Sequence, residues 1–66
     1  MKLYEAIANA RKYHNLSLRQ LEKKTGISNA LLWQMETGAV KNPSFRNIVK
    51  LSEVLKIPLA RLAKTE

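Results

Sequence analysis

The residues best suited to chemistry in this sequence fall on one face of a short predicted helix. At about 100° per residue, one arc of residues 29–37 is apolar and carries Leu31, Leu32 and Met35. The opposite arc carries two amides, a methyl, an indole and a hydroxyl, from Asn29, Ala30, Trp33, Gln34 and Thr37. Such groups can contact base edges in a DNA major groove. Because this arc is almost uncharged in a strongly basic chain, we interpret it as a contact surface rather than an ordinary solvated face.

This helix is predicted to be the second of a pair joined by a tight turn. Ser17 and Gln20 have the S-x-x-Q spacing of a reciprocal cap, which would begin the first helix of the pair. Gly26 can adopt the left-handed backbone angles that end it. Ser28 can cap the second helix, and Gly38 can end it. The sequence therefore predicts two helices and one turn within residues 17–38.

Three further helices are predicted around this pair. An apolar stripe at i, i+3, i+4 and i+7 indicates a helix over residues 2–14, and His14 at its end is expected to be a surface residue. A broad apolar face indicates a helix over residues 44–55, with Phe45 expected to anchor it in the core. Pro58 interrupts the pattern and can begin a short last helix.

The length and composition are those of one small domain over residues 1–66. A chain of this size buries only about 60% of the surface that it exposes when unfolded, so dimerisation or a ligand would add stability. Cysteine is absent and 45% of the residues are hydrophobic, which argues against a disulfide framework and against disorder. No signal peptide and no membrane-spanning run is recognisable, so we expect a cytoplasmic protein with no membrane partner.

The charge balance favours a polyanionic partner. Twelve Lys and Arg residues against five acidic residues give a formal net charge of +7, and the isoelectric point is near 10.2. A positive net charge is by itself weak evidence for a nucleic-acid partner, since a basic amphipathic helix can also lie on anionic lipid. Beside the helix pair, however, it favours nucleic acid.

The residue types that catalysis needs do not converge in this sequence. It has no cysteine, no aspartate, a single histidine and no glycine-rich loop. A nucleophile, a base and a group that orients the base cannot be assembled from this inventory. We therefore predict a protein that is not an enzyme and has no cofactor or metal site.

A resemblance to a known family is carried by the helix pair, S-L-R-Q-L-E-K-K-T-G-I-S-N-A-L-L-W-Q-M-E-T-G. The pair resembles the helix-turn-helix of the lambda-repressor-like, or Cro/XRE, family. The similarity extends upstream to Arg11 and downstream through N-P-S-F-x-x-I-x-K-L-S-E-V-L-K-I-P-L. It implies a compact all-α domain of five helices that binds double-stranded DNA through a recognition helix at about residues 28–37. Glu22 departs from the family, which usually has alanine there, so either the two helices splay or Glu22 turns toward solvent.

The resemblance also implies roles for individual residues. Base contacts are expected from the exposed arc of the recognition helix, at Asn29, Ala30, Trp33 and Gln34. Contacts to the DNA backbone are expected from polar residues around it, at Ser17, Arg19, Ser28, Thr37, Lys41, Asn42, Ser44 and Arg46. The free N–H groups of a helix N-terminus favour phosphate in the same way. Family members commonly pair an arginine and a glutamate at the positions of Arg11 and Glu36, so we expect a structural ion pair there.

The expected function is that of a transcriptional regulator, most simply a repressor that binds a palindromic operator as a homodimer. Apolar residues near the last helix exceed what one short helix can bury, and we expect a dimer interface from Ile57, Pro58, Leu59 and Leu62, with Leu59 as its exposed member. The alternative is an antitoxin-type or other protein-binding module in which DNA binding serves autoregulation. A fragment of a longer regulator is also compatible with the sequence. An RNA-binding or lipid-surface role is less favoured, because no aromatic-studded sheet is predicted and the apolar stripes are committed to the core.

Overall fold

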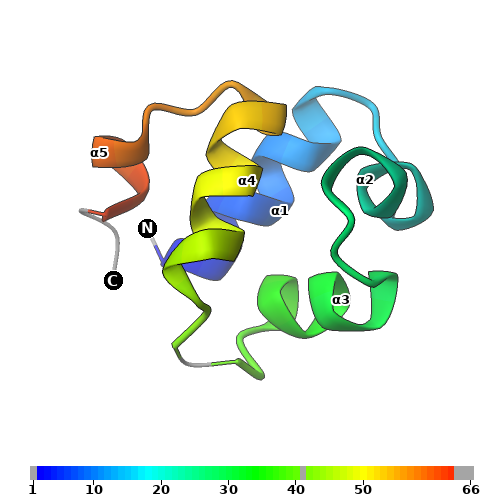
Figure 1. The fold of residues 1–66 in the computed structure, drawn as a ribbon, viewed down its shortest axis with the longest axis horizontal. Helices are drawn as coiled ribbons and strands as arrows, with labels where there is room; N and C mark the ends of the chain where they lie inside the picture. The colour runs from blue at the N-terminus through cyan, green and yellow to red at the C-terminus, as the bar shows by residue number, and fades with distance from the viewer. Residues whose placement is uncertain (1, 41, 64–66) are drawn as a thin grey trace.

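The structure is a computed structural model that describes residues 2–40 and 42–63, and these residues form five α-helices and no strand. In chain order the helices are α1 (Leu3–Tyr13), α2 (Leu18–Thr25), α3 (Asn29–Thr37), α4 (Phe45–Leu55) and α5 (Leu59–Ala63). In Figure 1, α4 crosses the centre of the molecule in front of α1, with α2 and α3 on one side and α5 on the other. The predicted all-α fold is confirmed.

Three helices begin at serine caps, and two of these, Ser17 and Ser28, are the caps that the sequence predicts. The Ser17 hydroxyl accepts from the Gln20 backbone N–H at 3.0 Å, while the Gln20 side chain accepts from the Ser17 N–H at 2.8 Å. Ser28 caps α3 and Ser44 caps α4 in the same way, each accepting a backbone N–H at 3.2 Å. Each cap satisfies one of the amides that a helix leaves unpaired at its start. The beginnings of α2, α3 and α4 are therefore determined locally.

Glycines end both helices of the pair. Gly26 follows α2 with φ of +79°, and Gly38 follows α3 with φ of +85°. Side chains disfavour this left-handed region, and glycine adopts it without a steric penalty. At Gly38 a Cβ would also lie 3.2 Å from the ring of Tyr4. The end of α3 is therefore fixed both by its backbone conformation and by the close approach of α1.

The core lies where the five helices meet. Each helix, and the turn between α2 and α3, contributes to it, through Ile7, Leu21, Ile27, Leu32, Met35, Ile48, Leu51, Leu55 and Leu62. Burying a side chain of this size contributes about 1.5–3 kcal/mol. In α4 the buried positions Ile48, Leu51, Ser52 and Leu55 follow the i, i+3, i+4, i+7 spacing. The core therefore holds α3 against α1 and α2 and leaves its other face outside.

The Thr25 side chain holds the turn between α2 and α3 in place through two hydrogen bonds. Its hydroxyl donates to the Leu21 carbonyl at 2.8 Å and accepts from the Ile27 N–H at 3.1 Å. Thr25 and Ile27 are both buried. These bonds occupy a backbone carbonyl of α2 and a backbone N–H of the turn, so the angle between the two helices is set by a packed, hydrogen-bonded joint.

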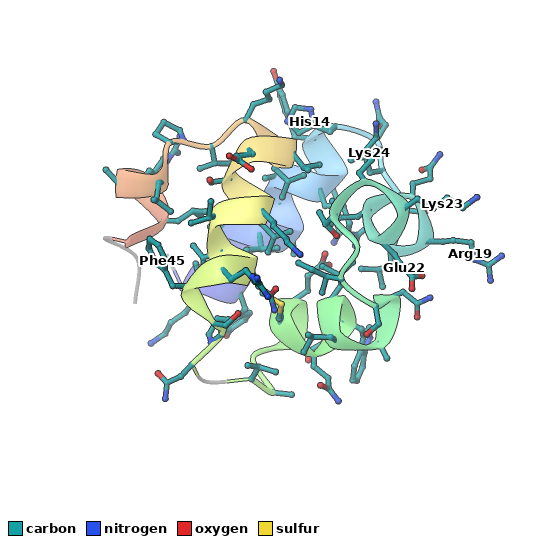
Figure 2. The ribbon with its side chains drawn as sticks, viewed as in Figure 1. His14, Arg19, Glu22, Lys23, Lys24 and Phe45 are labelled. Carbon is teal, nitrogen blue, oxygen red and sulfur yellow. The ribbon has the colours of Figure 1, made fainter. Side chains whose placement is uncertain are left out.

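Phe45 does not anchor α4 in the core, contrary to the sequence prediction. Its side chain is 71% exposed. Phe45 is the first residue of the helix, and side chains lean toward the N-terminus of the helix that carries them. Its ring therefore extends past the end of the core, and Figure 2 shows it projecting from the first turn of α4. The anchoring residues are the later ones, Ile48 and Leu51.

His14 is half-buried rather than a simple surface residue. Its Nε2 lies 2.7 Å from the carbonyl oxygen of Leu55, the last residue of α4. Because a carbonyl can only accept, Nε2 carries the hydrogen of this bond. His14 therefore ties the end of α1 to the end of α4 and satisfies one of the carbonyls that α4 leaves unpaired.

Candidate nucleic-acid interface

The outward face of α3 consists of the uncharged side chains predicted from the helical count. Leu32 and Met35 are buried and Leu31 is half-buried, which places the apolar arc against the core. The residues expected to read bases are all exposed, namely Asn29, Ala30, Trp33 and Gln34. The molecule therefore presents amide, methyl and indole groups side by side on one accessible helix.

Trp33 lies on this outward face and not in the core. Its side chain is 57% exposed, whereas Leu32 beside it is fully buried. An indole combines a large apolar ring with one N–H donor. It is stabilised most at a boundary where the ring is packed and the N–H is hydrogen-bonded. Its position makes Trp33 available to a partner that covers α3.

Two polar side chains of α3 already hold bonds within the chain. Asn29 Nδ2 donates to Glu22 Oε1 across the helix pair at 3.0 Å. The Thr37 hydroxyl donates to the carbonyl oxygen of Gln34 at 3.3 Å. The hydroxyl hydrogen of Thr37 is therefore committed to its own helix, which weakens its case as a donor to phosphate. Glu22 does not turn fully into solvent, because it is half-buried and bonded to α3.

The residues expected at a DNA backbone lie before α3, at its last residue and after it along the chain. They are exposed and polar, and comprise Ser17, Arg19, Ser28, Thr37, Asn42, Ser44 and Arg46. Lys41 lies outside the described residues. Figure 2 shows Arg19 extending outward from α2. As caps, Ser28 and Ser44 use an oxygen lone pair, so capping leaves their hydroxyl hydrogens for an acceptor such as phosphate. The first residues of α3 and α4 add the partial positive charge of helix N-termini.

Arg11 and Glu36 form a bidentate ion pair between α1 and α3. Arg11 Nε lies 2.6 Å from Glu36 Oε2, and one terminal nitrogen lies 2.8 Å from Oε1. The other terminal nitrogen donates to the Leu16 carbonyl at 2.8 Å. The two side chains are 15% and 7% exposed. The hydrogen bond to Glu36 raises the pKa of Arg11 against the opposing effect of partial burial. The pair fixes the C-terminal half of α3 on α1 and keeps Glu36 away from the outward face.

The residues expected at a dimer interface divide into two groups. Leu62 is only 2% exposed because it packs into the chain's own core, so it is not available to a second copy. Pro58 is exposed, and Ile57 and Leu59 are half-buried. The candidate interface is therefore smaller than the sequence suggests, and Pro58 rather than Leu59 is its exposed member. A groove of about 620 Å³ adjoins it between α1 and α5.

The described residues contain no group of three or more His, Cys, Asp or Glu side chains that could hold a metal ion. Within the same residues, no helix is long and apolar enough to cross a membrane.

A helix-turn-helix family model, HTH_3, matches residues 7–62 of the chain. No curated protein matches the chain. The matched segment runs from α1 to α5 and includes both helices of the pair, together with Arg11 and Glu36.

Solved structures of regulatory proteins share the fold. The master regulator for biofilm formation SinR, solved in complex with DNA, is 29% identical with a TM-score of 0.87, over 94% of this chain and 98% of that one. The P22 c2 repressor protein, solved in complex with a synthetic operator, is 27% identical with a TM-score of 0.88, over 100% and 98% of the two chains. The N-terminal DNA-binding domain of SinR from Bacillus subtilis is 28% identical with a TM-score of 0.88, over 97% and 93%.

Proposed function

The chain belongs to the HTH_3 helix-turn-helix family, and we propose that it is a DNA-binding transcriptional regulator that acts as a repressor on a palindromic operator. One observation carries the proposal. The outward face of α3 is exposed and uncharged, and exposed basic and hydroxyl side chains precede and follow it along the chain. Two of the similar structures are complexes with DNA, which supports the same partner for this chain.

Binding would use two layers of contact. Side chains such as Arg19 and Arg46, with the N-terminal amides of α3 and α4, hold phosphates and set the register of α3 along the groove. This layer is sensitive to salt and does not discriminate sequence. Asn29 and Gln34 then discriminate, since a bidentate amide–adenine pair is worth about 1–3 kcal/mol against a wrong base. Ala30 packs against a thymine methyl. Repression follows from occupancy, because the bound protein excludes polymerase from the promoter.

Selection of bound sequences from a random DNA pool tests the proposal. A palindromic consensus with two half-sites is the expected result. A pool that shows no enrichment after several rounds would contradict sequence-specific binding and would favour the protein-binding module instead.

Replacing Gln34 by alanine should remove discrimination at one base pair in each half-site. The expected loss is about 1–3 kcal/mol at that base pair. The salt dependence of binding should stay nearly constant, because a base contact releases few counterions. Arg46→Ala is the matched comparison, and it should weaken binding to all sequences alike and reduce the salt slope by about one unit. Equal losses on operator and random DNA for Gln34→Ala would contradict its role.

Trp33 should report directly on binding through its fluorescence. It is the only tryptophan in the chain, and its exposed indole should change its environment when α3 enters the groove. Emission should therefore shift or quench on titration with operator, and Trp33→Ala should weaken operator binding several-fold. The urea midpoint of this variant should stay close to that of the wild type, because Trp33 contributes little to the core. Emission that does not respond to bound operator would place Trp33 outside the contact.

A further inference from the structure

The carboxylate of Glu22, a residue of α2, is bonded to the first residue of α3. Its Oε1 accepts a hydrogen bond from Asn29 Nδ2 at 3.0 Å. Figure 2 shows Glu22 on the side of α2 that faces α3, whereas Arg19 and Lys23 extend outward from the same helix. Asn29 is exposed on the face that we propose reads DNA. An acidic side chain in this place repels phosphate, so we expect Glu22 to serve a function other than affinity for DNA.

The chemistry of the two groups determines how the amide is oriented. A carboxylate can only accept hydrogen bonds, whereas an amide has a donor end and an acceptor end. A free asparagine can exchange these ends by rotating its amide through half a turn. Beside Glu22 only one orientation makes a bond, because the other would set the amide oxygen against the carboxylate. Nδ2 therefore stays on the side of Glu22.

The joint that carries the two residues is rigid enough for this bond to position the amide. Leu21, adjacent to Glu22, is fully buried. Thr25 bonds to both α2 and the turn, and the Ser28 cap fixes the start of α3. The backbones of Glu22 and Asn29 are thus held in place by packing that neither side chain provides.

We propose that Glu22 is a positioning residue that holds the Asn29 amide in one orientation and so sets its base preference. This inference rests on the proposed function. One Nδ2 hydrogen is used by Glu22, which leaves the second hydrogen and Oδ1 for a partner. These form the donor and acceptor that adenine matches with N7 and its exocyclic amino group. A keto oxygen of guanine or thymine facing Oδ1 would set two acceptors against each other. Glu22 therefore makes Asn29 prefer a base that offers an amino group there.

The bond can be tested in the free protein, without DNA. In proton–nitrogen NMR spectra the two Asn29 side-chain N–H signals should be well separated, because only one hydrogen is bonded to a carboxylate. Glu22→Ala should bring them toward the values of a free asparagine, while Glu53→Ala, at an exposed acidic residue of α4, should not move them. Asn29 signals unaffected by Glu22→Ala would overturn the inference.

The consequence for recognition is tested with Glu22→Gln, which keeps the shape of the side chain and removes its charge. Glutamine can accept from Nδ2 or donate to Oδ1, so it permits both orientations of the Asn29 amide. The preference at the base pair read by Asn29 should fall about threefold to tenfold. That base pair is identified as the one at which Asn29→Ala loses preference. The base pair read by Gln34 should keep its preference, and affinity for random DNA should rise.

Glu53→Gln is the matched control for the change in charge. It should raise affinity for random DNA modestly and leave every base preference as in the wild type. If the wild type selects an operator and Glu22→Gln keeps the same base preference at every position, this inference alone is overturned. A wild type with no sequence preference would overturn the proposed function and this inference with it.

Discussion

Replacing Arg11 by methionine should lower the free energy of unfolding by about 3 kcal/mol or more. The substitution leaves the Glu36 carboxylate uncompensated at 7% exposure and removes the donor to the Leu16 carbonyl. A domain of this size has a total stability of only about 3–10 kcal/mol, so the variant should lose much of its folded population on modest heating. Glu36→Gln should cost less, because the glutamine oxygen can still accept from Arg11 and the bond to Leu16 remains.

A double-mutant cycle measures the pair itself. Urea unfolding of Arg11→Met, Glu36→Gln and the double variant should give a coupling of about 1 kcal/mol or more. Arg11→Lys should be intermediate, because lysine keeps the charge and loses the planar, bidentate geometry. Lys12→Met removes the same charge from the neighbouring exposed position and should change stability by no more than about 0.5 kcal/mol. Strict additivity in the cycle would show that the contact contributes nothing.

Placing a negative charge at Pro58 should abolish cooperative binding to a palindromic operator. We propose that two copies meet through the turn before α5, which would set their recognition helices about 34 Å apart on half-sites roughly 10 base pairs apart. Two Pro58→Glu carboxylates would then face each other across the two-fold axis. Affinity for the full operator should fall about 100-fold or more, toward that of a single half-site. Band-shift and sedimentation measurements on full and half operators would follow the loss.

The structure indicates why Pro58 is a better test than Leu59. Leu59 is half-buried and packs against the core, so a charge there would also destabilise the monomer. Pro58 is exposed and directly precedes α5, where an acidic side chain suits the positive end of the helix. Pro58→Ser, a neutral change at the same place, should retain cooperativity. Affinity of Pro58→Glu for an isolated half-site should match the wild type. A wild type that sediments on the full operator as a monomer would contradict the arrangement.

Local signals determined where α2 and α3 begin and end and where α4 begins. Ser17, Ser28 and Ser44 cap their own helices through bonds to residues three positions ahead. Gly26 and Gly38 end α2 and α3 through a backbone conformation that favours glycine. These interactions span a few residues, so the sequence contains them in full. The outward face of α3 followed in the same way, because helical geometry fixes which side chains share a face.

Contacts between distant residues were decided by the tertiary structure. Periodicity assigns Phe45 to the apolar face of α4 but does not say where along that helix the core ends, and the ring lies beyond it. It assigns Leu62 to an apolar surface without saying which neighbour covers it, and the neighbour is the chain's own core.

The Arg11–Glu36 pair was expected only through resemblance, since nothing in residues 25 positions apart indicates a contact. Glu22 was recognisable as a departure, but its bond to Asn29 depends on the angle between α2 and α3. The helical pattern shows on which side of one helix a side chain lies. These contacts depend instead on how several helices are placed against each other, and only the packing of the whole chain sets that placement.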